Sequence, residues 1–240
     1  MGWPCCSWEG FFEDAERVQE EIWSLVDPGG VVVVDVGVGD STRRLLEQGA
    51  TVVGVDRDAA RLRQLLHQPG AMVVEADFAY APLRRRSAGL VVFYFSLHEA
   101  DPALHQRMLL AARETAPRVM VVEPSPSGCP LYEEYAGLWR RAMHSIGGFE
   151  DYMPVEYWRR LLEETGFTVI QAKRVEWRAC IPYEVFRGIV EDTAEAWARL
   201  GVPGEYIRGL WSLLDRAKKE GFRWSDIYVI LAEGRGSHGG

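Results

Sequence analysis

The stretch VVVVDVGVGDST, residues 31–42, decides the fold of this 240-residue chain. Four consecutive β-branched residues after the break at Asp27–Gly30 predict a parallel strand that is covered on both faces. The strand runs directly into a turn with Gly37 and Gly39, and a helix is predicted over residues 42–48. Glycine has no Cβ atom, so its backbone can turn sharply and approach a ligand closely. The turn is therefore predicted to bind a ligand at a helix N-terminus.

Outward from this turn, strands and helices alternate along the chain. Apolar periodicity predicts a first amphipathic helix over 11–26, strands at 51–56, 71–75, 89–95 and 118–123, and helices at 58–67 and 102–115. Strands that alternate with helices of this length indicate βαβ units and a parallel sheet. Because such crossovers are right-handed, we expect an α/β fold with a doubly wound sheet.

The pattern changes after residue 124. Helices are predicted at 131–146, 154–165, 183–200 and 204–220, and strands at 168–177 and 226–232. We interpret residues 1–240 as a single domain. Its parts would be a cofactor-binding core at 28–124, helical lid or cap insertions at 125–153 and 181–222, a last strand at 226–232 and a flexible tail at 234–240.

Composition narrows the classes of partner. The formal net charge is −8, whereas proteins that bind nucleic acid usually present a basic face, so nucleic acid is not favoured. No apolar run approaches the ~20 residues of a membrane span, and the N-terminus lacks a signal peptide, so we expect a cytoplasmic protein. Cys5, Cys6, Cys129 and Cys180 show no paired spacing; reduced thiols are expected and no metal site is predicted.

The residues around the turn indicate which ligand binds. Asp56 ends the second strand, where a carboxylate can accept hydrogen bonds from both hydroxyls of a ribose. A dinucleotide turn requires Gly or Ala at the position of Thr42, and it has no use for Asp35 beside a pyrophosphate. Asp35 instead suits a ligand with a cationic ammonium group, such as S-adenosylmethionine. A nicotinamide-dependent oxidoreductase remains the alternative.

Over roughly residues 30–125 the chain resembles the class I S-adenosylmethionine-dependent methyltransferases, particularly the small-molecule, type 11-like branch. The segment DVGVG, residues 35–39, matches the first motif of that family, with Ser41 in place of the usual third glycine. Asp56 matches the acid that binds the ribose. The resemblance implies a Rossmann-like methyltransferase fold with a mostly parallel, seven-stranded sheet.

Further motifs of the family assign roles in this chain. The segment EADF, residues 75–78, matches the third-strand motif, which implies that Asp77 receives the adenine amino group and Phe78 lines the ring. The segment FSLH, residues 95–98, lies where relatives line the methionine side and the acceptor. The family's sheet also places an antiparallel seventh strand beside the fifth, for which residues 226–232 are the candidate. The predicted cofactor-binding residues are Asp35, Gly37, Gly39, Asp40, Ser41, Asp56, Arg57, Asp77, Phe78, Phe95 and Ser96.

Methyl transfer chiefly requires alignment of donor and acceptor, and a base is needed only when the nucleophile must lose a proton. His98 is the candidate base, because imidazole titrates near neutral pH. Glu99 would orient a base or bind a cationic substrate. In the alternative, His98 caps a helix or lines the cofactor pocket without moving a proton. His67, His105 and His238 are predicted to lie on the surface.

The segment after residue 124 is rich in aromatic residues. Its candidate acceptor-binding residues are Tyr132, Tyr135, Trp139, His144 and Tyr152, although the aromatics would equally suit the packing of a helical lid. The helices at 183–220 would form a cap or the surface of a homodimer. The leading prediction is a methyltransferase that uses S-adenosylmethionine and a small-molecule acceptor. A non-catalytic S-adenosylmethionine-binding protein and an enzyme that methylates RNA or protein stay open.

Overall fold

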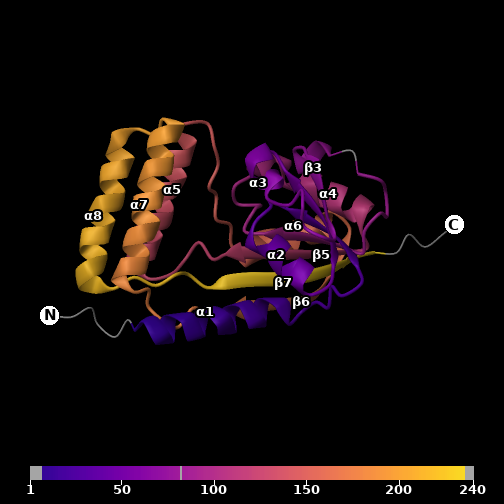
Figure 1. Ribbon diagram of the computed structural model, residues 1–240, viewed down its shortest axis with the longest axis horizontal. Coiled ribbons are helices and arrows are strands. Elements are labelled where there is room, and N and C mark those ends of the chain that lie inside the picture. Colours follow the sequence, from indigo (N-terminus) through magenta and orange to yellow (C-terminus); the bar gives the residue numbers. More distant parts are fainter. Residues whose placement is uncertain (1–6, 82, 236–240) are drawn as a thin grey trace. The chain divides into compact units, whose positions relative to one another are not determined.

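The computed structural model describes residues 7–81 and 83–235. The chain divides into two compact units (Figure 1). The helical unit consists of Met1–Ile22, Pro124–Met153 and Arg174–Ile227, and the sheet unit consists of Trp23–Glu123, Pro154–Lys173 and Tyr228–Gly240. The interpretation of the whole chain as one domain with two helical insertions stays a prediction.

The sheet unit is built on one sheet of seven strands, counted over the described residues. The strands are β1 (Val32–Val36), β2 (Thr51–Asp56), β3 (Ala71–Glu75), β4 (Leu90–Tyr94), β5 (Arg118–Pro124), β6 (Phe167–Val175) and β7 (Ile227–Gly234). Their order is β3-β2-β1-β4-β5-β7-β6. The pairs from β3 to β5 are all parallel. The predicted doubly wound, mostly parallel α/β sheet is confirmed.

The order places a topological switch point between β1 and β4, where connections leave in opposite directions and ligands bind at the carboxyl ends of the strands. The central strands are buried on both faces, with Val33, Val52, Val91 and Phe93 fully inaccessible. This burial explains the continuous β-branched runs, because a parallel sheet covered by helices has no polar face. The covering helices are α2 (Asp40–Glu47), α3 (Ala59–Arg63), α4 (His105–Thr115) and α6 (Val155–Glu164), with short 3₁₀ turns η1 (Phe78–Tyr80) and η2 (Pro102–Leu104).

Strand β7 lies between β5 and β6. The backbone N–H of Ser125 bonds to Asp226 near the end of β5, and the N–H of Gly234 bonds to Pro117 near its start. Because one sequence number rises as the other falls, β7 runs antiparallel to β5. This matches the insertion expected for residues 226–232, although the strand continues to Gly234 and so takes in the first residue of the predicted tail; residues 236–240 of that tail lie outside the described residues.

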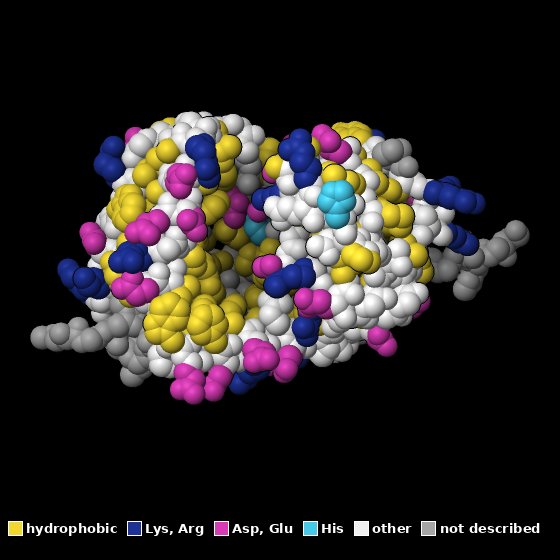
Figure 2. All heavy atoms as spheres, viewed as in Figure 1, with side chains coloured by type: hydrophobic (Ala, Val, Ile, Leu, Met, Phe, Trp, Pro, Cys, Tyr) yellow, Lys and Arg dark blue, Asp and Glu magenta, His cyan; other side chains and the backbone are white. Residues whose placement is uncertain are grey.

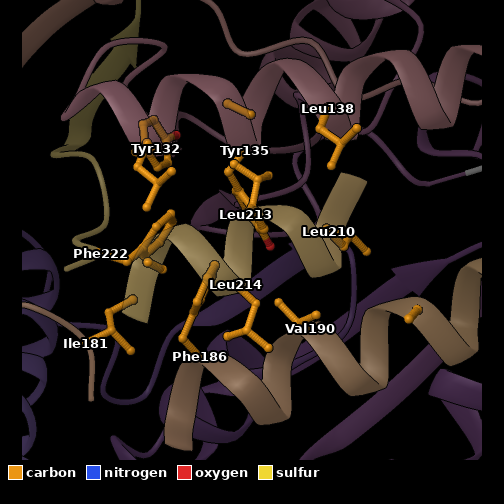
Figure 3. Packing of buried hydrophobic residues seen from close by; sticks show 14 of the residues in the cluster. Tyr132, Tyr135, Leu138, Ile181, Phe186, Val190, Leu210, Leu213, Leu214 and Phe222 are labelled. Atoms are coloured by element: carbon orange, nitrogen blue, oxygen red, sulfur yellow. The ribbon is translucent and has the colours of Figure 1, made fainter. Parts of the chain in front are cut away.

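The helical unit contains α1 (Trp8–Trp23), α5 (Pro130–His144), α7 (Tyr183–Leu200) and α8 (Gly204–Glu220). Helices α5, α7 and α8 lie side by side and turn apolar side chains toward one another (Figure 3). Phe186 of α7 stacks on Phe222 at 4.1 Å between ring centroids, and Tyr135 of α5 meets Phe222 edge-on. The helical spacing that predicted these elements therefore reflects a core of their own.

Three details differ from expectation or fall outside the description. Helix α3 ends at Arg63, before the predicted residue 67. Cys180 is disulfide-bonded, so the expectation of a reduced thiol is wrong for this residue. Cys129 is free, and Cys5 and Cys6 lie outside the described residues.

No helix in the described ranges is long and apolar enough to cross a membrane. On the face drawn in Figure 2, acidic and basic side chains are interspersed.

Candidate active site

The glycine turn after β1 closely approaches the loop after β4. Gly37 has a φ of +86°, in the left-handed region that favours glycine. Its N–H donates to the carbonyl oxygen of Val55 at 2.9 Å, which ties the turn to β2. A Cβ at Gly37 would lie 2.9 Å from Cβ of Ser96. Gly37 is therefore required both by its backbone conformation and by the contact between the two loops.

Asp35 organises the helix that follows the turn. Its buried carboxylate accepts hydrogen bonds from the hydroxyls of Ser41, at 2.9 Å to Oδ2, and Thr42, at 2.5 Å. Thr42 Oγ1 in turn accepts from the N–H of Gly39 at 3.2 Å. Burial raises the pKa of Asp35 to about 7, against the hydroxyl hydrogen bonds, which lower it. Direct contact between Asp35 and a ligand's ammonium group stays a prediction.

Asp56 connects the ends of β1 and β2. Its Oδ2 accepts from the N–H of Val38 at 2.9 Å, and its Oδ1 accepts from the N–H of Asp58 at 2.8 Å. Arg61 of α3 places Nη1 3.8 Å from the same carboxylate. A carboxylate has about four lone-pair sites, so both oxygens retain capacity for ligand hydroxyls. Sequence reasoning did not single out Arg61, because nothing in its spacing marked it.

A cavity of about 950 Å³ opens beside these loops in the sheet unit. Its lining comes from the glycine turn, helix α2, helix α3 and the end of β4. The lining residues are Gly37, Val38, Gly39, Asp40, Ser41, Arg43, Leu46, Glu47, Arg61, Gln64, Leu65, Gln68, Tyr94, Phe95, Ser96 and Glu99. The structure thus brings together six predicted cofactor residues, namely Gly37, Gly39, Asp40, Ser41, Phe95 and Ser96.

Two features of this cavity fit a polar ligand. Ser96 lines it, and Oγ of Ser96 is buried without a hydrogen-bond partner among the described residues; such an atom is costly unless a ligand or water satisfies it. Gly39 also lines the cavity, and a Cβ there would meet no protein atom within 4 Å. Packing does not require glycine at this position, so its backbone is open to a ligand.

The remaining predicted cofactor residues are not part of this cavity's lining. Asp77 Oδ1 accepts from the N–H of Ala79 at 2.9 Å and so begins η1, while Oδ2 lies 3.9 Å from Nη1 of Arg57. Phe78 is buried and meets Phe93 edge-on at 5.5 Å. The structure therefore shows local structural contacts for Asp77 and Phe78, and their roles toward adenine stay predictions.

The loop after β4 carries the candidate base. Phe95 has a φ of +50°, an uncommon conformation for a residue with a side chain. Nδ1 of His98 lies 2.5 Å from Oε2 of Glu123, and both side chains are buried. Glu99 is exposed and lines the cavity. Glu123 is therefore a carboxylate that holds His98, and the expected role of Glu99 in orienting a base or binding a cationic substrate stays a prediction.

His105 is buried, so its predicted surface position is wrong. Its Nε2 lies 2.8 Å from the carbonyl oxygen of Leu97, and its Nδ1 lies 2.9 Å from the hydroxyl of Tyr157. Burial lowers the pKa of His105, which favours the neutral ring. His67 is exposed as predicted, and His238 lies outside the described residues.

The predicted acceptor residues lie in the helical unit. Tyr132 and Tyr135 point into its core (Figure 3), and Tyr132 donates its hydroxyl to the carbonyl oxygen of Ser125 at 3.0 Å. Burial raises the pKa of Tyr132 to about 12 and raises that of Tyr135 further. Both hydroxyls are therefore neutral near pH 7.

The other three candidates also have partners within this unit. Trp139 meets Trp197 edge-on at 5.0 Å. His144 Nε2 lies 2.8 Å from Oδ2 of Asp151. Tyr152 donates its hydroxyl to Glu150, and burial raises its pKa. Contact between any of these residues and an acceptor stays a prediction.

Comparison with known proteins identifies similar methyltransferases. The family described as "Methyltransferase domain" matches residues 34–122. The chain is 46% identical to Ribosomal RNA small subunit methyltransferase A of Synechococcus sp. (strain JA-2-3B'a(2-13)) over 61 residues, which cover 24% of this chain and 22% of that protein. It is 25% identical over 178 residues to an uncharacterized methyltransferase of Geobacillus sp. (strain WCH70), covering 67% of this chain and 83% of that one.

Among solved structures, the fold is similar to that of Burkholderia thailandensis 1,6-didemethyltoxoflavin-N1-methyltransferase, a protein solved with 1,6-didemethyltoxoflavin and S-adenosylhomocysteine. The TM-score is 0.55 at 16% identity, and the alignment covers 93% of this chain and 79% of that one. The domain match begins at β1 and ends in β5, and so spans the glycine turn, Asp56 and the β4 loop. Residues 34–122 therefore match the methyltransferase domain family, and the motifs and strand order of the chain are similar to those of class I S-adenosylmethionine-dependent methyltransferases of the type 11 branch.

Proposed function

We propose that this protein transfers the methyl group of S-adenosylmethionine to a small-molecule acceptor. The observation that carries the proposal is the cavity at the carboxyl ends of the parallel strands, walled by the glycine turn and the β4 loop. Ligands bind at this place in doubly wound sheets. The solved relative with a small aromatic heterocycle and S-adenosylhomocysteine supports a small acceptor.

The chain's own residues suit the cofactor. The open backbone of Gly39 allows close approach of a ligand, and Asp56 has hydrogen-bonding capacity for ribose hydroxyls. The lining holds three acids, Asp40, Glu47 and Glu99, against two arginines, Arg43 and Arg61, and this small excess of negative charge favours a cationic ligand. When bound, the cofactor supplies an electrophilic methyl group, which bonds to the acceptor as its bond to sulfur breaks and leaves both electrons on sulfur.

We assign His98 as the base that takes the proton of an acceptor O–H or N–H group. His98 itself is buried and does not contribute to the cavity lining, but its sequence neighbours Ser96 and Glu99 do, and its Nδ1 is held by a buried carboxylate. The proton passes to Nε2 of His98 and from there to solvent. Acid–base catalysis of this kind contributes about 10²- to 10⁴-fold in rate.

Nucleic acid is a less suitable acceptor. The net charge is −8, and basic side chains do not gather on the face drawn in Figure 2. Phosphate neutralisation dominates nucleic-acid binding and requires a concentrated basic surface. The similarity to a ribosomal RNA methyltransferase covers 24% of this chain and therefore concerns a part of the domain only.

Calorimetric titration with S-adenosylhomocysteine and with NAD tests the cofactor assignment. We expect binding of S-adenosylhomocysteine, and a preference for NAD would overturn the proposal. Asp56→Ala should lose about 10- to 100-fold in affinity, because it removes the ribose acceptor and the backbone hydrogen bonds from Val38 in the glycine turn and from Asp58 before α3. Asp27→Ala, in the loop before β1, is the matched control. Unchanged affinity in Asp56→Ala would contradict the placement of the ribose.

Transfer of a labelled methyl group tests catalysis. The wild-type protein is incubated with labelled S-adenosylmethionine and a metabolite fraction, and in parallel with total RNA and total protein. We expect label in the small molecules. Label in RNA or protein alone would overturn the acceptor class, and cofactor binding without transfer in any fraction would indicate a non-catalytic binding protein.

A further inference from the structure

Glu123 is a buried carboxylate at the end of β5 that the sequence did not connect with the active site. Its side chain is 1% exposed. It does not line the cavity, yet it bonds to three successive residues of the loop that does. Burial of a carboxylate costs free energy unless hydrogen bonds satisfy it. The hydrogen-bond partners of Glu123 therefore indicate its role.

The two carboxylate oxygens of Glu123 contact different groups of the β4 loop. Oε1 accepts from the backbone N–H of Ser96 at 3.1 Å and from that of Leu97 at 2.8 Å. Oε2 faces Nδ1 of His98 at 2.5 Å. One carboxylate therefore fixes the backbone of the β4 loop and the imidazole ring together.

The contact with Oε2 favours one tautomer of His98. An ionised carboxylate offers only lone pairs, so Nδ1 of His98 must carry the hydrogen of this bond. In the neutral ring the lone pair is then on Nε2. A base that acts through Nε2 requires this tautomer, which is the less common one for a free imidazole.

His105 provides an opposite case in the same unit. The carbonyl oxygen of Leu97 can only accept, so Nε2 of His105 carries the hydrogen and Nδ1 accepts from Tyr157. The two histidines thus hold the loop at Leu97 and His98 with opposite tautomers. His105 is an internal reference for any measurement on His98.

We propose that Glu123 is a positioning residue for methyl transfer: it holds His98 with the proton on Nδ1, so that Nε2 takes the proton of the acceptor. This inference rests on the assignment of His98 as the base. When Nε2 becomes protonated, the carboxylate of Glu123 stabilises the imidazolium ion. Proton release to solvent then restores the starting state.

Glu123→Gln separates this role from loop support. The amide oxygen of glutamine can occupy the position of Oε1 and keep both backbone N–H bonds. Its NH₂ group then faces Nδ1 and donates to it, which moves the ring proton of His98 to Nε2. Flipping the amide would forfeit both backbone bonds, so the geometry favours the orientation that produces the wrong tautomer.

The tautomer is read by long-range ¹H–¹⁵N correlation on histidine-labelled protein and requires no acceptor. In the wild type at pH above the titration of the ring, we expect His98 with a proton on Nδ1 and His105 with a proton on Nε2. In Glu123→Gln, His98 should change to the Nε2-protonated form while His105 stays as it was. An Nε2-protonated His98 in the wild type would overturn the proposal without any variant.

Kinetics on an identified acceptor complete the test. Glu123→Gln should lose about 100-fold or more in kcat, similar to His98→Ala, with affinity for S-adenosylhomocysteine within about twofold of wild type. The double variant should be no slower than either single one. Glu114→Gln, an exposed carboxylate of α4 that pairs with Arg85, is the matched control and should keep wild-type kcat.

The outcomes distinguish this inference from the proposed function. Absence of methyl transfer by the wild type counts against the function and leaves the tautomer measurement standing. Loss of activity in His98→Ala together with wild-type kcat in Glu123→Gln would overturn the role of Glu123. A fall in cofactor affinity and melting temperature with no change of tautomer would show that Glu123 only supports the loop, which also overturns it.

Discussion

The two loops that wall the cavity are held by different means. In the glycine turn, Asp35 is bonded to Ser41 and Thr42, which lie six and seven residues along the chain. In the loop after β4, the holding groups are Glu123, 25 residues beyond His98, and His105, whose own partner Tyr157 is 52 residues further on. The first loop is organised locally and the second by tertiary structure.

This difference has a physical consequence for each loop. The glycine turn depends on one fully buried carboxylate and on a close contact without space for a Cβ. Substitution of Asp35 or Gly37 should therefore have a large effect on stability, because no second group can replace the lost carboxylate or make room for the added Cβ. The β4 loop has supports from two directions, β5 and α4, so the loss of an outer support should cost little.

The largest expected effect concerns the charge of Asp35. Burial raises its pKa from 3.8 to about 7. Between these values the folded protein keeps a proton that the unfolded chain releases, so the folded state is favoured at low pH and loses this advantage as the pH rises through 7. At about 1.4 kcal/mol per pH unit, the free energy of unfolding should fall by roughly 4 kcal/mol between pH 4 and pH 8 relative to Asp35→Asn.

Chemical denaturation of wild type and Asp35→Asn at each pH measures this difference. Asp40→Asn removes an exposed carboxylate from the same turn and serves as the matched control. Parallel stability curves for wild type and Asp35→Asn would show that the charge of Asp35 is not penalised in the fold. The charge of Asp35 would then give the glycine turn no greater effect on the pH dependence of unfolding than the β4 loop has.

The next effect comes from the contact between the two loops. In Gly37→Ala the new Cβ would lie 2.9 Å from Cβ of Ser96, at a φ of +86°. Overpacking together with the left-handed conformation should lower the free energy of unfolding by about 2–3 kcal/mol. Affinity for S-adenosylhomocysteine should fall as well, because both walls of the cavity shift.

Gly39→Ala is the matched variant in the same turn. Gly39 has an extended φ of −178°, and its Cβ would meet no protein atom within 4 Å. Its stability should stay within about 0.5 kcal/mol of wild type, while the methyl group in the cavity lowers cofactor affinity. Equal destabilisation by both variants would refute the distinction between packing at Gly37 and ligand access at Gly39.

The local organisation of the glycine turn explains why sequence could predict it. A β-branched run, two glycines and an acid at the end of the next strand all lie within 26 residues, and each leaves a pattern. The alternation of strands and helices predicted the parallel sheet, and the family resemblance predicted the position of the last strand beside the fifth. Local pattern also placed α7 and α8 correctly, although it did not indicate the core that they form with α5.

The contacts that hold the β4 loop correspond to no local pattern in the sequence. Glu123 ends an apolar strand, and only the adjacency of β4 and β5 brings it to His98. The sequence predicts a surface position for His105, whereas Tyr157 and Trp158 of α6 cover it. Contacts between elements distant in sequence are invisible to periodicity, so the sequence points only to the neighbouring Glu99 as a group that orients a base or binds a cationic substrate, and it does not reveal Glu123.

The smallest effect should follow from removal of the outermost support of the β4 loop. Tyr157→Phe deletes the hydroxyl that donates to Nδ1 of His105 at 2.9 Å and should cost about 1 kcal/mol in unfolding free energy. The carbonyl of Leu97 still requires the hydrogen on Nε2, so the tautomer of His105 should not change. Cofactor affinity should match that of Tyr80→Phe, a control for an exposed tyrosine in the same unit. A loss of affinity as large as that of Gly37→Ala would mean that this loop, too, depends on a single contact, and the contrast between the two loops would fail.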